Sequence, residues 1–193
     1  MIATKNVRIG YSEAVTRGEL QDLLIAGDRH WNPRISGLFY YGRQLAARAV
    51  SENAPNSLVV SSLLLKSCQF VASGTISEEA WTGDSLLASG AYDWLHCNLG
   101  EAVAETIRLQ PTTKRFLATV VPNYFRQLHI ESQRRLFMDG GFMTHIERAT
   151  FCGNRYHANA MTIARWADSP SDVFVDTPEM EFFFSFVDSV AFL

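Results

Sequence analysis

Apolar and polar residues along the chain form short patterned segments, most of which end at glycine or proline. Residues 6–11 alternate in polarity and predict a strand. The segment 16–28 has leucines on one helical face, and Thr16 and Glu19 have the spacing of a capping box, so it predicts a helix. We expect this helix to end at Gly27, because glycine adopts the left-handed conformation that closes many helices.

The next part of the chain is dense in apolar residues and shows no clear helical spacing. Residues 30–55 contain prolines and glycines, and they predict loops around an apolar stretch that fits either a strand or a helix. Residues 56–76 crowd valine, leucine and phenylalanine together and predict one or two buried strands. Residues 76–96 predict a turn at Thr82–Asp84 and then an extended apolar and aromatic segment that ends at His96.

The second half of the chain alternates between predicted helices and predicted strands. A helix rich in alanine and glutamate is expected at 100–111, and a buried strand at 114–122. A second helix is expected at 128–141, where two glycines end it, and strands at 142–151 and 156–166. This order of elements predicts a mixed sheet with helices covering both faces.

Length and composition indicate an ordinary globular protein. With 193 residues, 47% of them hydrophobic and 19% charged, the chain suits a single domain spanning 1–193. Residues 167–193 form a phenylalanine-rich C-terminal extension. We expect this extension to pack against the body of the same chain or against a second subunit of a homodimer.

The charge pattern argues against two classes of partner. The formal net charge is −3 and no long basic run occurs, so nucleic-acid binding is not expected. No apolar run is long enough to cross a bilayer, and the first ten residues lack the apolar core of a signal peptide. We therefore expect a cytoplasmic protein without membrane contact.

The cysteines do not indicate a disulfide framework. Cys68, Cys97 and Cys152 are widely spaced, odd in number and not arranged as a CxxC pair. His96 beside Cys97, and Cys152 five residues before His157, are conceivable metal ligands, but structural zinc takes ligands at tighter paired spacings. The prediction is buried thiols and surface imidazoles, with no metal site.

The turn 98–102 is a candidate anion site. It is expected to connect the extended segment that ends at His96 to the helix at 100–111. A helix N-terminus presents unpaired N–H groups, and the missing side chain of Gly100 lets a ligand approach closely, which suits a phosphate or pyrophosphate. The alternative is an ordinary helix start that contains glycine and binds nothing.

This turn and the elements after it resemble the GNAT superfamily of acyl-CoA-dependent N-acyltransferases. Residues 97–102 match the family's pyrophosphate loop, Gln/Arg-x-x-Gly-x-Gly/Ala, with Cys97 in place of the first residue. Asn123 is similar to the residue that ends the family's fifth strand. Residues 141–142, Gly-Phe, are similar to the opening of its sixth strand, and the resemblance covers about residues 85–166.

The resemblance implies an α/β (α+β) fold with a mixed, mostly antiparallel central sheet flanked by helices on both faces. It implies transfer of an acetyl or longer acyl group from acetyl-CoA or another acyl-CoA to an amine on a small molecule or protein. Backbone groups of one strand would bind the pantetheine arm, and amides of the turn would bind the pyrophosphate. The residues it assigns to the cofactor are Trp94, Leu95, His96, Cys97, Asn98, Leu99, Gly100, Glu101, Ala102 and Asn123.

Catalytic groups can be proposed from the same resemblance. Many family members use a tyrosine as the acid at the position that Phe137 occupies here, and phenylalanine has no proton to donate. Tyr124 and Ser132 are substitutes in the same region, while Asp93 or His96 could act as the base. The structural alternative for each is a solvated or half-buried side chain without a catalytic role.

Two other functions stay open. A catalytically inactive module of the same fold, binding acyl-CoA or another protein, is consistent with Cys97 and Phe137. The first 50 residues also resemble BLUF flavin photosensors, with Tyr11 and Asn32 as flavin contacts. That family's glutamine on the next strand is absent, because Ala47 or Arg48 stands there.

Overall fold

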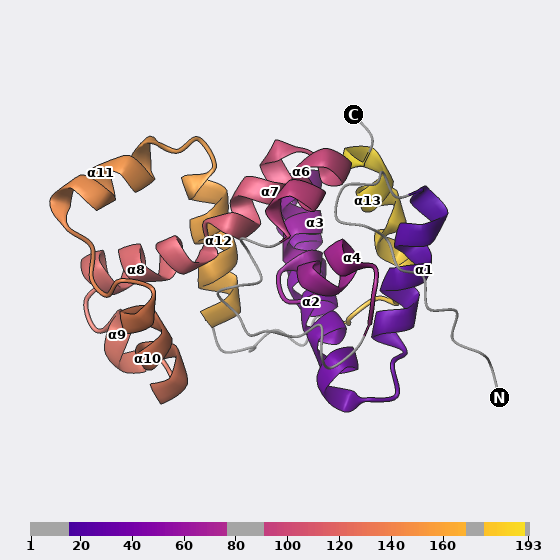
Figure 1. Cartoon of the computed structure of the whole chain (residues 1–193), viewed down its shortest axis with the longest axis horizontal. Coiled ribbons are helices and arrows are strands. Elements are labelled where there is room, and N and C mark those ends of the chain that lie inside the picture. Colours follow the sequence, from indigo (N-terminus) through magenta and orange to yellow (C-terminus); the bar gives the residue numbers. More distant parts are fainter. Residues whose placement is uncertain (1–15, 77–90, 169–175, 192–193) are drawn as a thin grey trace.

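A computed structural model describes residues 16–76, 91–168 and 176–191, and every regular element in these ranges is helical (Figure 1). The α/β class and the helix-flanked mixed sheet are therefore wrong for this part of the chain. The elements, in chain order, are α1 (Arg17–Asp28), α2 (Pro33–Ser51), α3 (Asn56–Leu64), α4 (Cys68–Ser73), α6 (Tyr92–Leu99), α7 (Glu101–Arg108), α8 (Gln110–Val120), α9 (Tyr124–Gln127), α10 (Ile130–Met138), α11 (His145–Gly153), α12 (His157–Asp168), the 3₁₀ helix η1 (Met180–Phe183) and α13 (Phe184–Val190).

The larger hydrophobic core surrounds the pair formed by α2 and α3. In Figure 1, α1 and α13 lie on one side of this pair, and α7 and α12 lie on the other. Phe39, Phe70 and Trp94 are among the largest fully buried side chains of this core. Phe39 and Phe70 contact each other with ring centroids 6.1 Å apart.

The helix α3 explains why the strands expected at 56–76 are absent. All seven residues from Leu58 to Leu64 are at most 4% exposed, so the helix is buried on every side. Such a helix has no polar face, and its sequence cannot be distinguished by periodicity from that of a buried strand. The segment instead forms α3 and α4, and the ambiguous stretch before it forms α2.

A second, smaller group of helices extends to one side of this core (Figure 1). Here α9, α10 and α11 pack around α8, and the core contains Leu109, Met143, Phe151 and Ala160. The strands predicted at 114–122, 142–151 and 156–166 correspond to α8, α11 and α12, so those predictions are wrong.

Three helix predictions are confirmed. The capping box of Thr16 and Glu19 is present at the start of α1, which continues one residue past Gly27. The helices expected at 100–111 and 128–141 correspond to α7 and α10. Pro111 does not end a helix but lies in the first turn of α8, where proline is tolerated because its missing N–H would be unpaired.

The described part of the C-terminal extension packs against the body of its own chain. Met180 and Phe183 are fully buried in the larger core. The Nη1 of Arg43 donates a hydrogen bond to the carbonyl oxygen of Pro178 at 2.6 Å, and Arg29 pairs with Glu181 at 2.7 Å. The described part of the extension therefore packs against the body of the chain, and its packing against a second subunit stays a prediction.

Several predictions fall outside the described residues, namely the strand at 6–11, the turn at Thr82–Asp84 and the flavin contact Tyr11. Asn32, the other proposed flavin contact, caps α2 through a hydrogen bond that its Oδ1 accepts from the amide of Arg34 at 2.9 Å. None of the helices described is both long enough and apolar enough to cross a membrane.

Candidate functional site

The residues assigned to the pantetheine arm lie within helix α6, not on a strand. The amide of Leu95 donates to the carbonyl oxygen of Ala91 at 2.9 Å, as in any helix. Trp94 and Leu95 are fully buried, and their backbone groups belong to the helical ladder. These positions therefore cannot present a free strand edge to a ligand.

The turn at Gly100 joins two helices. Gly100 has φ 80° and ψ 165°, a conformation accessible almost exclusively to glycine, and its amide donates to the carbonyl oxygen of His96 at 3.2 Å. Asn98 is buried, and its side-chain amide donates to the carbonyl oxygen of Trp94 at 2.9 Å, while Leu99 is also buried. The glycine thus allows the sharp change of direction between α6 and α7.

The other predicted residues of this region lie on the surface of α6 and α7. Asp93 and Cys97 are exposed, and His96 contacts the ring of Tyr92 with centroids 5.8 Å apart. Glu101 forms an ion pair with Arg155 at 2.6 Å. Ala102 follows it in the first turn of α7 and accepts a hydrogen bond from Thr106.

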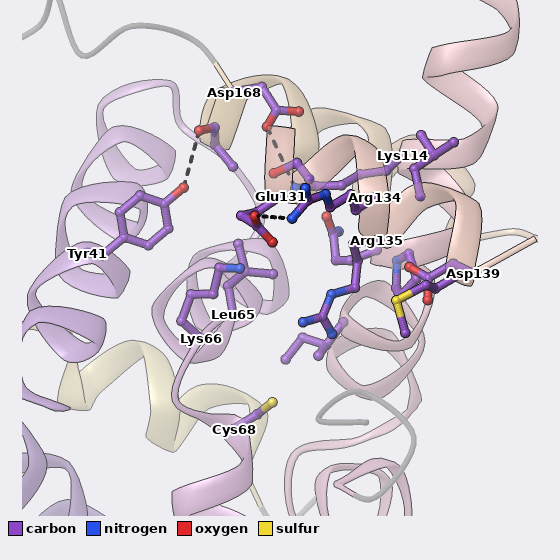
Figure 2. Close-up of a pocket in the computed structure, with 17 residues that line it drawn as sticks. Tyr41, Leu65, Lys66, Cys68, Lys114, Glu131, Arg134, Arg135, Asp139 and Asp168 are labelled. Carbon is purple, nitrogen blue, oxygen red and sulfur yellow. Dashed lines mark hydrogen bonds and ion pairs between the residues drawn. The ribbon is translucent and has the colours of Figure 1, made fainter. Parts of the chain in front are cut away.

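The main cavity lies elsewhere, between the α3–α4 connection and helices α8, α10 and α12 (Figure 2). Its volume is about 430 Å³, within the range of small-molecule sites. Tyr41, Leu65 and Cys68 contribute from the larger core, and Ser132 and Leu136 contribute from α10. The cavity is thus formed by elements that are far apart in the sequence.

Seven of the described residues that line this cavity are charged. Figure 2 shows Lys66 and Arg135 extending toward the same space from different elements. The cationic lining residues are Lys66, Lys114, Arg134 and Arg135. The acidic lining residues are Glu131, Asp139 and Asp168. Positive groups therefore exceed negative groups by one, and no histidine is among the described lining residues.

Asp168, at the end of α12, connects three elements at the cavity. The phenol of Tyr124, on α9, donates a hydrogen bond to its carboxylate, and Lys114 Nζ lies 3.9 Å from Asp168 Oδ1. Burial and this hydrogen bond to Asp168 raise the pKa of Tyr124, so the phenol keeps its proton. Tyr41 donates to the carbonyl oxygen of Ala167 at 3.3 Å and so holds the end of α12 against α2.

Helix α10 presents a polar face to the cavity. Ser132, Arg135 and Asp139 are spaced by three and four residues, which places them on one side of the helix. Burial raises the pKa of Asp139, and the nearby charges of Arg135, Arg115 and Lys114 oppose that rise. Glu131 pairs with Arg134 at 3.0 Å at the outer edge of the same helix.

The structure brings together part of the predicted catalytic set. Ser132 lines the cavity, and Tyr124 contacts it through Asp168. Asp93 and His96 do not line it, nor does Asn123, which has φ 65° at the start of α9. The roles proposed for these residues in acyl transfer have no counterpart in this arrangement.

Sequence reasoning missed the cationic residues of the cavity. One signal was present at Lys66, which is the single charged residue between Glu52 and Glu78 and lies among buried apolar neighbours. A second was the polar face of the correctly predicted helix α10, since its charges repeat at helical spacing. The contributions of Lys114 and Asp168 follow from the tertiary fold and had no local signal.

The described residues contain no group of three or more histidine, cysteine or acidic side chains that is arranged to hold a metal ion. Cys68 lines the cavity and is fully buried, while Cys97 and Cys152 are exposed elsewhere.

Comparison with known proteins gives one curated relative. The chain matches no family model. It is 33% identical over 108 residues to the hydroxymethylphosphonate dioxygenase of Gimesia maris, over 51% of this chain and 54% of the relative. The chain thus spans about half the length of that relative.

This relative and the helical fold overturn the acyltransferase interpretation. A GNAT enzyme requires a central sheet, and the described residues form none. The similarity is to a dioxygenase, so transfer from acetyl-CoA or another acyl-CoA is no longer supported. The inactive acyl-CoA module and the BLUF-like photosensor relied on sheet folds and are withdrawn for the same reason.

Proposed function

We propose that the cavity between the α3–α4 connection, α8, α10 and α12 binds a small organic oxyanion of the phosphonate class. The observation that carries this proposal is the convergence of Lys66, Lys114 and Arg135 from three elements on one cavity of about 430 Å³. The cationic lining residues outnumber the carboxylates of the cavity by one, so an anionic ligand would balance the charge of the lining.

The side chains offer the donors that a phosphonate needs. A guanidinium can donate two parallel hydrogen bonds to a phosphonate, and an ammonium acts as a compact point charge. The hydroxyl of Ser132 and the apolar side chains of Leu65 and Leu136 line the same space. They would contact the organic part of the ligand, while the cations bind its charged oxygens.

The curated relative supports the choice of ligand. Its name gives hydroxymethylphosphonate as the molecule on which it acts, and this molecule is small and anionic. A cavity of 300–1,000 Å³ is usual for small ligands. Hydroxymethylphosphonate is accordingly the first compound to test.

The relative's activity favours a second candidate function, which is oxidation of this ligand by dioxygen. Enzymes generally bring dioxygen into reaction through a metal ion or an organic cofactor. The described residues do not fit a metal centre, because their histidine, cysteine and acidic side chains form no suitable group. Ligand binding is therefore the function that the geometry supports best.

Isothermal titration calorimetry with hydroxymethylphosphonate tests the proposal. We expect one site per chain, and binding that weakens as salt is added, because salt screens the cations. Lys114→Gln and Arg135→Gln should each weaken binding about tenfold or more, as expected for the loss of a charge-assisted hydrogen bond. Arg34→Gln removes the same charge from an exposed position outside the cavity and serves as the matched control.

A ligand that binds the folded chain must also raise its melting temperature. Equal losses of affinity in Arg34→Gln and Arg135→Gln would indicate a general charge effect and contradict the assigned site. No heat and no thermal shift at millimolar phosphonate would overturn the proposed function itself.

A further inference from the structure

We infer that this cavity holds its oxyanion through lysine and arginine side chains and without a metal ion. The inference rests on the proposed function, because it concerns how the same ligand is bound. It departs from what the relative's dioxygenase activity would suggest, and it depends on where the carboxylates of the cavity lie and what they contact.

The two acidic residues contributed by α10 are too far apart to share an ion. Glu131 and Asp139 lie eight residues apart, which is about 12 Å along a helix axis. Oxygen ligands lie about 2.0–2.6 Å from a divalent cation, so two ligands of one ion are within about 5 Å of each other. The two carboxylates therefore face different parts of the cavity.

Two of the three carboxylates already have partners among the described residues. Glu131 pairs with Arg134 at 3.0 Å. Asp168 accepts a hydrogen bond from Tyr124 and lies 3.9 Å from Lys114. A metal ion at either carboxylate would have to displace these groups and would add charge to a cavity in which cations are already in excess.

The other common metal ligands are also unsuited to this cavity. No histidine lines it in the described part of the chain, and its one thiol, Cys68, is fully buried at the α3–α4 connection. Metal centres that react with dioxygen keep several nitrogen or oxygen ligands together with open positions. Among the described residues, the lining contains no group of three or more histidine, cysteine or acidic side chains that could hold such an ion.

The cations supply the charge that a metal ion would otherwise bring. Lys66, Lys114 and Arg135 reach the cavity from the α3–α4 connection, α8 and α10, so they can approach one tetrahedral oxyanion from several directions. An arginine fork and two ammonium groups can bind the oxygens of a phosphonate without any metal. Binding should then be insensitive to chelators and sensitive to salt.

The experiment combines metal analysis with calorimetry on the full chain. The protein is purified without chelator, and its iron, manganese, zinc and copper are measured by plasma mass spectrometry. We expect well below one metal ion per chain. Hydroxymethylphosphonate is then titrated into untreated protein, into protein dialysed against EDTA, and into protein supplied with Fe²⁺ or Mn²⁺. The dissociation constants should agree within about twofold, close to the error of the method.

A charge-preserving variant separates ligand contact from folding. Arg135→Gln should weaken binding in EDTA about tenfold or more, and Arg135→Lys should recover only part of that loss, because it restores the positive charge but not the two parallel hydrogen bonds of the guanidinium. Both variants are checked by circular dichroism and melting temperature, and Arg34→Gln is again the control. Wild-type affinity of Arg135→Gln in EDTA would contradict the inference.

The outcomes distinguish this inference from the proposed function. A stoichiometric metal ion whose removal abolishes phosphonate binding would overturn the inference and leave the proposed site in place. Oxygen uptake with phosphonate and an added metal would overturn it in favour of the oxidative candidate. Absence of binding under every condition would overturn both, whereas metal-free, chelator-resistant binding supports both.

Discussion

Arg43 and Asp28 form a buried ion pair in which Nε lies 2.9 Å from Oδ1, and their side chains are 10% and 6% exposed. The pair connects α2 to the end of α1, and Arg43 also bonds the carbonyl oxygen of Pro178. Burial raises the pKa of Asp28, and the charge of Arg43 opposes that rise. Arg43 thus contacts both the end of α1 and the C-terminal segment.

Removing one member of this pair should destabilise the protein strongly. Arg43→Met leaves the carboxylate of Asp28 buried without its partner, and such losses cost about 3–5 kcal/mol. The double variant Arg43→Met/Asp28→Asn should be more stable than Arg43→Met, because it also removes the isolated charge. Urea unfolding of the two single variants and the double variant measures this coupling. If the losses in the free energy of unfolding of the two single variants simply add up to that of the double variant, the two residues are not coupled and the prediction is wrong.

The same pair gives a pH dependence of defined sign. Without Arg43, the pKa of Asp28 in the folded state should rise further above its ordinary 3.8. The folded state then binds a proton that the unfolded chain has released, so the stability of Arg43→Met should fall as pH rises above about 4. The double variant lacks the carboxyl group and should not show this fall. Denaturant unfolding between pH 4 and 8 compares the two, and parallel profiles would contradict the assignment.

Gly42 sets the distance between α2 and α3. A Cβ at this position would lie 2.1 Å from the carbonyl oxygen of Leu63, and backbone cannot move aside as a flexible side chain can. Gly42→Ala should therefore cost about 3 kcal/mol or more, the upper part of the range for overpacking. Gly37, on the same helix, has open space around its Cβ position, so Gly37→Ala should stabilise by about 0.5–1 kcal/mol. Thermal unfolding compares the melting temperatures of the two variants. Similar changes in melting temperature would show that α2 and α3 can move apart to make room for the Cβ at position 42.

The helices predicted correctly from the sequence have one apolar face and a clear end. Helix α1 has its capping box at Thr16 and Glu19, and α10 is followed by two glycines. The incorrect strand predictions fall where these signals are weak. Helix α3 is buried on all sides, so its pattern lacks a period.

Two of the errors have further physical explanations. In α8, Thr119 favours a strand by propensity, but its hydroxyl donates to the carbonyl oxygen of Arg115 within the helix. The start of α11 carries a capping box of Thr144 and Glu147, the same signal that identified α1. Consistent use of that rule would have predicted α11 as a helix.

The candidate site could be predicted only in part. Ser132 was proposed as a site residue from the sequence, and the helix that carries it, α10, was predicted correctly. Lys66 and Asp168 are 102 positions apart in the chain, and nothing local indicates that they line the same cavity. The packing of helices around α8 brings these residues together, so their proximity can be recognised only from the tertiary structure.

The capping box of α11 predicts an acid-sensitive contact. Hydrogen bonds from Thr144 and from the guanidinium of Arg115 lower the pKa of Glu147 to about 2, from an ordinary value of 4.5. A carboxyl group whose folded pKa is lowered stabilises the protein above its unfolded pKa, and this contribution is lost as pH falls from 4.5 toward 2. The melting temperature of Glu147→Gln should thus lie below that of the wild type at pH 6 and approach it at pH 3.

The capping box of α1 provides the control for this prediction. Hydrogen bonds from Thr16 lower the pKa of Glu19, but no arginine contributes. At pH 6, Glu19→Gln should therefore lower the melting temperature less than Glu147→Gln does. The additional loss in Glu147→Gln measures the contact between Arg115 and Glu147. Identical profiles for the two variants would show that this arginine adds nothing to the stability of α11.

Asp168 should compete with the proposed ligand for Lys114. Its carboxylate lies 3.9 Å from Lys114 Nζ and places a negative charge at the edge of a cavity proposed to bind an anion. Asp168→Asn removes that charge and keeps an oxygen that can accept the hydrogen bond from Tyr124. Hydroxymethylphosphonate should then bind about threefold to tenfold more tightly, because removing a screened negative charge from the edge of the site is worth on the order of 1 kcal/mol. Calorimetry at low salt measures the change, and weaker binding to Asp168→Asn would show that the carboxylate supports the ligand instead of repelling it.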